Sequence, residues 1–181
     1  MNLETSYLGL NLPHPLIAGA SPIVDHLDLV KRLEDAGCAA IVMHSLFEEQ
    51  VVAHAAGVEA HMTSHENSHA EAKTYFPENV DFRLDPDQYL EQIRKLKETV
   101  SMPVIASING FNENTWADYA KQVESAGADA LELNLYRVPT DVDLAGDTII
   151  QRLVDLINEI RKVTHLPLAV KNSPFITSLP N

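Results

Sequence analysis

Short apolar runs alternate with stretches of helical periodicity along most of the chain. In residues 129–135 the leucines fall on every second position, and Glu132 and Asn134 lie between them. Side chains alternate between the two faces of a strand, so this run predicts a strand with one apolar and one polar face. An antiparallel surface strand has the same pattern. Here Ala-Gly-Ala precedes the run and a helical pattern follows it, which favours a parallel βαβ series.

The same reasoning gives the other elements. Apolar residues three and four positions apart predict helices at Leu27–Ala36, Asp87–Val100, Asn112–Ala126 and Asp147–Val163. Apolar runs predict strands at Leu16–Ser21, Cys38–Met43, Met102–Gly110 and Leu166–Lys171, and a hairpin is expected within Leu3–Leu12. Asp25 or Asp28 is expected to cap the first helix, which Gly37 ends. Strands alternating with helices indicate a parallel sheet with right-handed crossovers.

Internal repetition supports this order. Residues 34–40 are similar to 124–130, and residues 102–106 are similar to 166–170. About five strands and four helices fit in 181 residues, whereas a complete parallel (β/α)8 barrel takes about 250. The expected fold is therefore a single α/β domain, residues 1–181, that forms the N-terminal part of a TIM barrel. The series is expected to stop before the barrel closes.

The segment 48–86 interrupts the pattern. It is rich in His, Glu and Ala and has few large apolar residues after Val52. It is too long for an ordinary connection, so we expect a lid, an inserted helix or disorder. Three of its histidines, His61, His65 and His69, would share one helix face and suit zinc or nickel. The polar, low-complexity setting favours a solvated helix, so no metal site is predicted.

Composition narrows the class of protein. The chain is 45% hydrophobic and 22% charged, as is usual for a globular domain. Its net charge of −13 argues against a nucleic-acid surface and against an anionic membrane as partner. The one cysteine, Cys38, excludes a disulfide framework and indicates a reducing compartment. With no signal-peptide or membrane-spanning pattern visible, we expect a cytoplasmic protein that binds a small molecule.

The candidate chemistry lies where the predicted strands end, because barrel enzymes collect their catalytic groups there. These residues are Ala20, Ser21, His44, Ser45, Ser107, Asn109, Asn134 and Lys171. A set of short hydrogen-bonding side chains with one lysine is more typical of a site that binds a planar, amide-rich ring than of a site that catalyses hydrolysis. No nucleophile–base spacing and no Gly-rich phosphate loop is visible. Glu132 is expected deeper in the interior, paired with Lys171 in a structural ion pair.

Several blocks of sequence, taken in order, resemble the dihydroorotate dehydrogenases. They are Ala20-Ser21, Ser45 after its apolar strand, Glu66-Asn67-Ser68, Met102–Gly110, Glu132-Leu133-Asn134-Leu135 and Pro167–Lys171. The resemblance implies a TIM barrel that binds FMN at the carboxyl ends of its strands. In that family the flavin takes a hydride from dihydroorotate, so FMN is the expected cofactor.

The resemblance also implies roles for single residues. Ala20 and Ser21 would lie along the flavin, and Lys171 would approach its ring, where positive charge stabilises the reduced anion. Asn134 would bridge flavin and substrate, and Asn67 would bind the pyrimidine. The remaining strand-end residues are expected to complete the cofactor site (Ser45, Ser107 and Asn109).

Three departures from the family pattern bear on activity. His44 replaces a lysine, and we expect it to act as a flavin neighbour or proton donor, with a buried structural histidine as the alternative. The family runs Leu-Ser-Cys-Pro-Asn after the asparagine that corresponds to Asn134, with Cys or Ser as the catalytic base. Here the run is Leu-Tyr-Arg-Val-Pro, so the base and the last asparagine are missing. Strands six to eight, which hold the FMN phosphate in that family, are absent from these 181 residues.

The expected function is therefore a divergent FMN-dependent oxidoreductase acting on dihydroorotate or a related pyrimidine. The alternative is a non-catalytic partial barrel that acts only by association, and a homo-oligomer is expected. A Schiff-base aldolase that uses Lys171 is a third reading, which lacks an acid–base constellation.

Overall fold

The computed structural model describes residues 2–48, 50, 51, 85–110, 113–136, 140, 141 and 143–173. The side chains of residues 113–115 are not described. Most of the predicted lid, residues 48–86, lies outside these ranges. Asn67 and the four histidines of that segment lie outside them too, so their predicted roles stay predictions.

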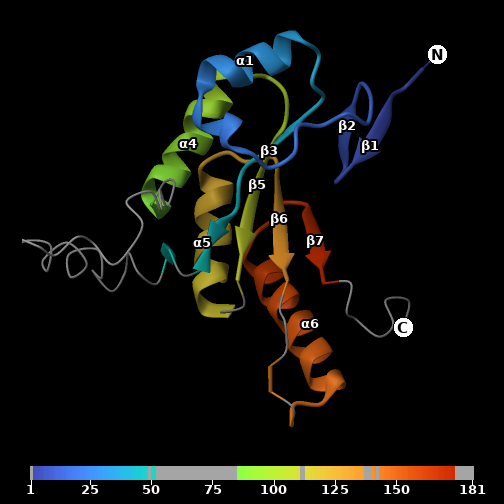
Figure 1. Ribbon diagram of the computed structural model, residues 1–181, viewed down its shortest axis with the longest axis vertical. Coiled ribbons are helices and arrows are strands. Elements are labelled where there is room, and N and C mark those ends of the chain that lie inside the picture. The colour runs from blue at the N-terminus through green and yellow to red at the C-terminus, as the bar shows by residue number, and fades with distance from the viewer. Residues whose placement is uncertain are drawn as a thin grey trace, which may run out of the picture.

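A parallel sheet curls through the centre of the chain as part of a TIM barrel (Figure 1). Its strands are β3 (Ile41–Val42), β4 (Leu46–Phe47), β5 (Val104–Asn109), β6 (Ala130–Leu135) and β7 (Leu168–Asn172). They pair in the order β3–β5–β6–β7. Strand β4 pairs with the later part of β5, on the same edge as β3. The predicted parallel α/β fold is confirmed.

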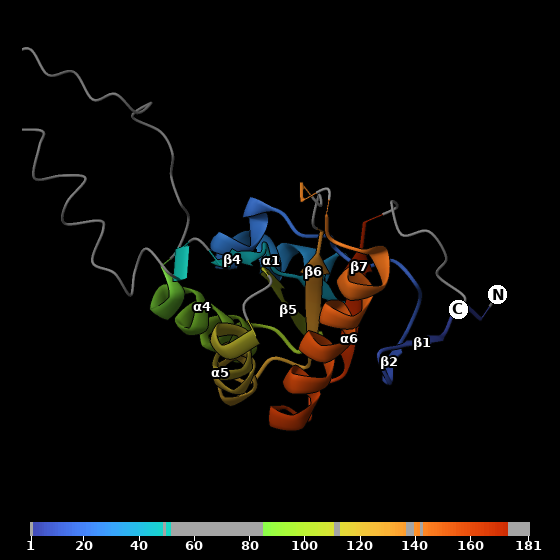
Figure 2. The same cartoon turned by 90° about the horizontal axis from the view of Figure 1, so that it is seen from below.

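Helices follow the strands and cover one face of the sheet. They are η1 (Pro22–Asp25, a 3-10 helix), α1 (Leu27–Asp35), α4 (Pro86–Thr99), α5 (Glu113–Ser125) and α6 (Gly146–Val163). Figure 2 shows α4, α5 and α6 side by side on that face. The leucines of β6 are buried there, in one core cluster with Trp116 of α5 and Leu156 of α6.

The opposite face of the sheet is the barrel interior, and an N-terminal hairpin packs at its amino end. The hairpin consists of β1 (Thr5–Tyr7) and β2 (Leu10–Leu12), joined by Leu8 at φ 53° and Gly9 at φ 72°. Two residues in the left-handed region are what a two-residue hairpin turn requires. Leu12 is buried in a second cluster with Val42, Ile105 and Ala130. The hairpin thus covers the floor of the interior.

The first half of the predicted strand Leu16–Ser21 runs parallel beside β3, and the second half does not. The Leu16 carbonyl accepts from the Ala39 N–H, and Ala18 donates to the Ala40 carbonyl and accepts from the Val42 N–H. Gly19 and Ala20 bring almost no side chain to bury, and Pro22 at the start of η1 stops the extended backbone. Ser21 therefore serves as the N-cap of η1, where its Oγ accepts from the backbone N–H of Ile23 at 3.4 Å.

The two sequence repeats correspond to a structural repeat. Gly37 and Gly127 follow α1 and α5 at φ 89° and 97°, and each ends its helix in the same way. Glu34 accepts hydrogen bonds from the backbone just before Pro103, and Glu124 accepts from the backbone just before Leu166. Each glutamate thereby ties a helix to the loop that leads into a later strand.

Candidate functional site

The polar side chains of the interior lie at two levels near the carboxyl ends of the strands. Strand register defines the levels, because paired residues of neighbouring strands lie side by side. The deeper level contains Ser107 and Glu132, and Ser45 joins it through a 2.9 Å bond between the two serine Oγ atoms. The level at the mouth contains Phe47, Asn109, Asn134 and Lys171 in adjacent strands.

A continuous hydrogen-bond network joins the two levels. Asn134 donates from Nδ2 to the Oγ atoms of Ser45, at 2.7 Å, and Ser107, at 3.0 Å. Ser107 in turn donates to Glu132 Oε1 at 3.3 Å. The structure thus brings together side chains from three strands or strand ends that are far apart in sequence.

The predicted ion pair between Lys171 and Glu132 is present. Lys171 Nζ lies 3.0 Å from Glu132 Oε1. The side chain of Glu132 is 7% exposed and that of Lys171 is 59% exposed. Burying a carboxylate is costly unless it is paired and hydrogen-bonded, and Lys171 and Ser107 satisfy that need. Lys171 keeps its other ammonium hydrogens at the accessible mouth.

An irregular pairing separates β3 from β4. Val42 pairs with Ile105 and Leu46 pairs with Ile108, so residues 43–45 lie opposite only two residues of β5. Tyr89 of α4 lies at this irregularity. Its hydroxyl accepts from the backbone N–H of Ser107 and donates to the Ser107 carbonyl, both at 2.9 Å. Burial raises the pKa of the Tyr89 hydroxyl far above its usual range, so this group stays protonated.

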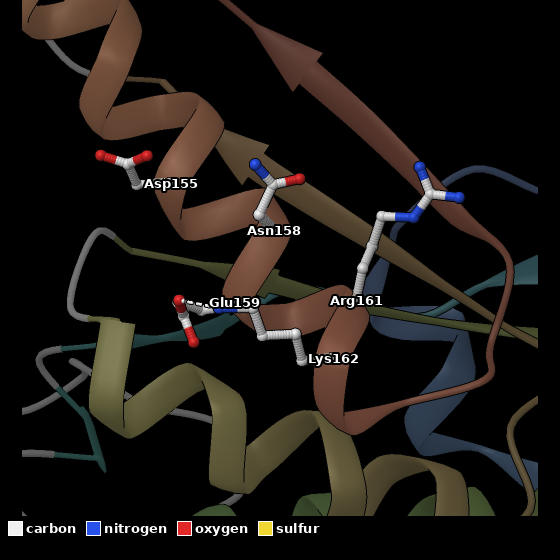
Figure 3. A pocket seen from close by; sticks show the side chains of 5 residues that line it. All are labelled: Asp155, Asn158, Glu159, Arg161 and Lys162. Carbon is white, nitrogen blue, oxygen red and sulfur yellow. Dashed lines mark hydrogen bonds and ion pairs between the residues drawn. The ribbon is translucent and has the colours of Figure 1, made fainter.

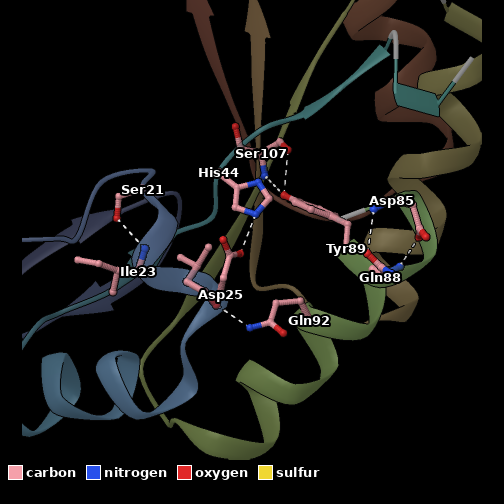
Figure 4. Close-up of polar contacts among 10 residues, drawn as sticks. Ser21, Ile23, Asp25, His44, Asp85, Gln88, Tyr89, Gln92 and Ser107 are labelled. Carbon is pink, nitrogen blue, oxygen red and sulfur yellow. Dashed lines mark hydrogen bonds and ion pairs between the residues drawn. The ribbon is translucent and has the colours of Figure 1, made fainter. Parts of the chain in front are cut away.

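The extra residue in the 43–45 segment, relative to β5, changes the direction in which the His44 side chain points. Its Nε2 lies 3.0 Å from Asp25 Oδ1, and its ring meets the ring of Tyr89 edge to face at 5.6 Å (Figure 4). Asp25, predicted as a helix cap, thus serves as the partner of His44, and His26 takes the N-cap position without a side-chain bond. The side chain of His44 is 14% exposed. Its catalytic role stays a prediction.

The sequence is similar to two groups of dehydrogenase. The NAD-dependent dihydropyrimidine dehydrogenase subunit PreA of Escherichia coli is 25% identical over 97% of this chain. The catalytic subunit of dihydroorotate dehydrogenase B of Thermoplasma acidophilum is 26% identical over 98% of it. The chain thus resembles the dihydropyrimidine and dihydroorotate dehydrogenases at low sequence identity. It spans 43% of the length of the first protein and 56% of the second.

Two further comparisons concern fold and family. A solved structure of a variant of NCR from Zymomonas mobilis matches 95% of this chain with a TM-score of 0.56, and the chain covers 58% of it. At 9% identity that likeness concerns the fold alone. No family model matches the sequence.

The remaining predicted site residues are less closely grouped. Asn109 lies beside Asn134 at the mouth level, and its cofactor-binding role stays a prediction. Ala20 is exposed and Ser21 is engaged in its cap, so neither forms a hydrogen bond to the network within the described part of the chain. Sequence reasoning missed Phe47 and Tyr89. The alternation Ser45-Leu46-Phe47 was the available signal for Phe47, whose side chain is 44% exposed at the mouth level.

Other features of the described residues do not compete with this site. The outer face of α6 carries a shallow depression lined by Asp155, Asn158, Glu159, Arg161 and Lys162 (Figure 3). All five residues belong to one helix and lie outside the barrel interior, so no converging group from another element shapes a ligand there. Among the described helices, none has the length and apolar character needed to cross a bilayer.

Proposed function

We propose that this chain forms the ring-binding part of an FMN-dependent oxidoreductase that acts on dihydroorotate or a related dihydropyrimidine. The observation that carries the proposal is the network at the strand ends, where an amide and a lysine reach the mouth from one buried cluster. The names of the relatives support the substrate class. FMN would supply the acceptor for the substrate's hydride.

The residues present fit the ring of FMN. Asn109, Asn134 and Lys171 offer hydrogen-bonding groups and one positive charge side by side, and Phe47 adds an exposed aromatic face at the same level. A flavin ring is planar, carries polar atoms along one edge and gains negative charge on reduction. The donor set therefore suits the ring.

Replacement of Lys171 tests this proposal. We expect Lys171→Ala to weaken FMN binding to the purified chain, because the mouth loses its positive charge and Glu132 is left buried without its ionic partner. Binding is measured by titration of FMN with absorbance detection. Lys121→Ala, on the outer face of α5, makes the same change of charge and should leave binding unaltered. Equal FMN affinity in both variants would exclude Lys171 from the site.

The missing base gives a second prediction. Arg137 occupies the position of the family's Cys or Ser, and it lies outside the described residues. General base catalysis supplies about 10²- to 10⁴-fold in rate, so oxidation of dihydroorotate by the FMN-loaded protein should be slow by about that factor. Arg137→Cys should raise the rate. Rapid turnover by the unaltered protein would show that another residue, such as Tyr136 or His44, acts as base.

A second candidate function is association with another copy or with a partner chain. Two observations favour it: the chain spans about half the length of its relatives, and both relatives named above are called subunits. In this reading the partial barrel contributes its site only within an assembly. Sedimentation, described in the Discussion, tests this candidate.

A further inference from the structure

The direction of hydrogen bonds in the network follows from one buried carboxylate. An asparagine amide has two orientations that exchange Oδ1 and Nδ2, and the surrounding donors and acceptors decide between them. Ser107 lies next to both Asn134 and Glu132. Its hydroxyl has a single hydrogen to donate.

Glu132 settles where that hydrogen goes. As the carboxylate partner of Lys171, Glu132 only accepts, so Ser107 donates to Glu132 Oε1. Ser107 Oγ is then left with acceptor capacity alone. It takes a hydrogen from Asn134 and another from Ser45, whose Oγ lies 2.9 Å away. Asn134 must therefore turn Nδ2 toward the serines.

The same orientation leaves Asn134 Oδ1 as an acceptor at the mouth. Both Nδ2 hydrogens are used by Ser45 and Ser107, and Oδ1 has no hydrogen bond to any residue within the described part of the chain. Lys171 is paired with Asn134 on the neighbouring strand, and its ammonium group offers hydrogen-bond donors. The mouth thus presents an acceptor beside a donor.

We propose that Glu132, acting through Ser107, is the positioning residue that orients Asn134 so that the site selects a ligand with an imide edge, an N–H flanked by carbonyls. The N–H would meet Asn134 Oδ1 and a neighbouring carbonyl would meet Lys171. Both a flavin and a pyrimidine carry this edge. The inference rests on the proposed function for its ligand class, and it adds two residues, Glu132 and Ser107, that need not touch the ligand.

Methylated probes test the selection. The unaltered chain should bind FMN more tightly than N3-methyl-FMN, or uracil more tightly than 3-methyluracil, by about tenfold, the equivalent of one hydrogen bond. Discrimination within the flavin pair alone assigns the imide to the cofactor, and discrimination within the uracil pair alone assigns it to the substrate. Equal affinities within both pairs would overturn the inference.

Variants within the network test the role of Glu132. Ser107→Ala keeps the pair of Glu132 with Lys171 but removes the relay, so Asn134 is free to turn and the preference for the unmethylated probe should disappear. Glu132→Gln should have the same effect. Ser6→Ala, which removes an exposed serine hydroxyl of the hairpin outside the network, is the matched control, and discrimination should remain there. Loss of discrimination in Ser6→Ala, or its retention in Ser107→Ala, would contradict the proposed relay.

A measurement without ligand separates this inference from the proposed function. In the unaltered protein, NMR should show both side-chain amide hydrogens of Asn134 protected from exchange with water, and Ser107→Ala should release one of them. Rapid exchange of both hydrogens in the folded, unaltered protein would overturn the hydrogen-bond order. If neither FMN nor uracil binds while both hydrogens are protected, the proposed function and the ligand class fall, and the orientation of Asn134 by Glu132 stands.

Discussion

Glu34 joins two parts of the chain that are far apart in sequence. Its Oε1 accepts from the backbone N–H and the Oγ of Ser101, both at 2.6 Å, and from the N–H of Met102 at 3.1 Å. Lys31 donates to the other carboxylate oxygen at 2.7 Å. Lys31 and then Ser101 hold the pKa of Glu34 at about 2, below its ordinary value of 4.5. The charged form is therefore the one that the fold stabilises.

Stability should depend on the charge of Glu34 in a defined pH window. Because the pKa is lower in the folded state, the stabilisation is complete above about pH 4.5 and is lost as the pH falls toward 2. Glu34→Gln should lower the free energy of unfolding at pH 7 by about 1–2 kcal/mol. It should also reduce the change in that energy between pH 5 and pH 2. Urea unfolding followed by circular dichroism measures both effects.

The exposed Glu98 of α4 offers a control for this prediction. Glu98→Gln removes the same charge from an exposed position, so it should leave the unfolding energy and its pH dependence close to those of the unaltered chain. If the two variants behave alike, the contacts of Glu34 do not contribute to stability.

At the scale of elements, the hairpin β1–β2 contributes a floor to the barrel interior. Leu12 is 4% exposed within the cluster that includes Ile105 and Ala130, whereas Leu3, just before the hairpin, is 52% exposed. A floor of apolar side chains keeps water away from the deeper side of the polar network. The hairpin is thus part of the support of the site, although none of its residues forms a hydrogen bond to that network among the residues that the structure describes.

Leu12→Ala should therefore destabilise the fold, whereas Leu3→Ala should not. Removing a buried leucine side chain costs about 2–5 kcal/mol, through lost burial and the cavity left behind. Leu3→Ala removes the same atoms from an exposed position and leaves no cavity. Urea unfolding of the two variants checks this prediction. Equal unfolding energies would show that the hairpin detaches from the sheet in solution.

The sequence predicted most elements because their pattern is local. Alternation in β6 and the proline-led runs before β5 and β7 needed no knowledge of neighbours, and the pairing of Lys171 with Glu132 followed from their faces and depth. The extra residue between Val42 and Leu46 was not predictable, because a bulge exists only relative to the partner strand. That one residue decides that His44 meets Asp25 and Tyr89.

At the scale of the whole molecule, β7 presents a backbone edge. Among the described residues β7 pairs only with β6. The Pro167 carbonyl accepts from Leu131 on that side, so the N–H groups of Leu168, Val170 and Asn172 point to the other side. Unpaired strand edges promote pairing with another chain. This edge is therefore a structural basis for the second candidate function, association with another copy or with a partner chain.

We expect the 181-residue chain to self-associate with rising concentration in sedimentation experiments. Asn172→Pro removes one outward N–H at an exposed position and should lower the associated fraction, because proline cannot donate to a strand added at this edge. Asn172→Ala keeps the N–H and should associate as the unaltered chain does. A single monomeric species at every concentration would argue against association through β7.

Trp116 is the single tryptophan of the chain, and it is 1% exposed. It packs so closely on Gly110, the residue that follows β5, that a Cβ on that glycine would collide with its Nε1. The indole therefore sits, shielded from water, next to the strand end where the ring is proposed to bind. Its emission overlaps the absorption of a flavin, so energy transfer would quench it when a flavin occupies the mouth. The chain carries an intrinsic optical reporter of its own occupancy, and no label has to be introduced.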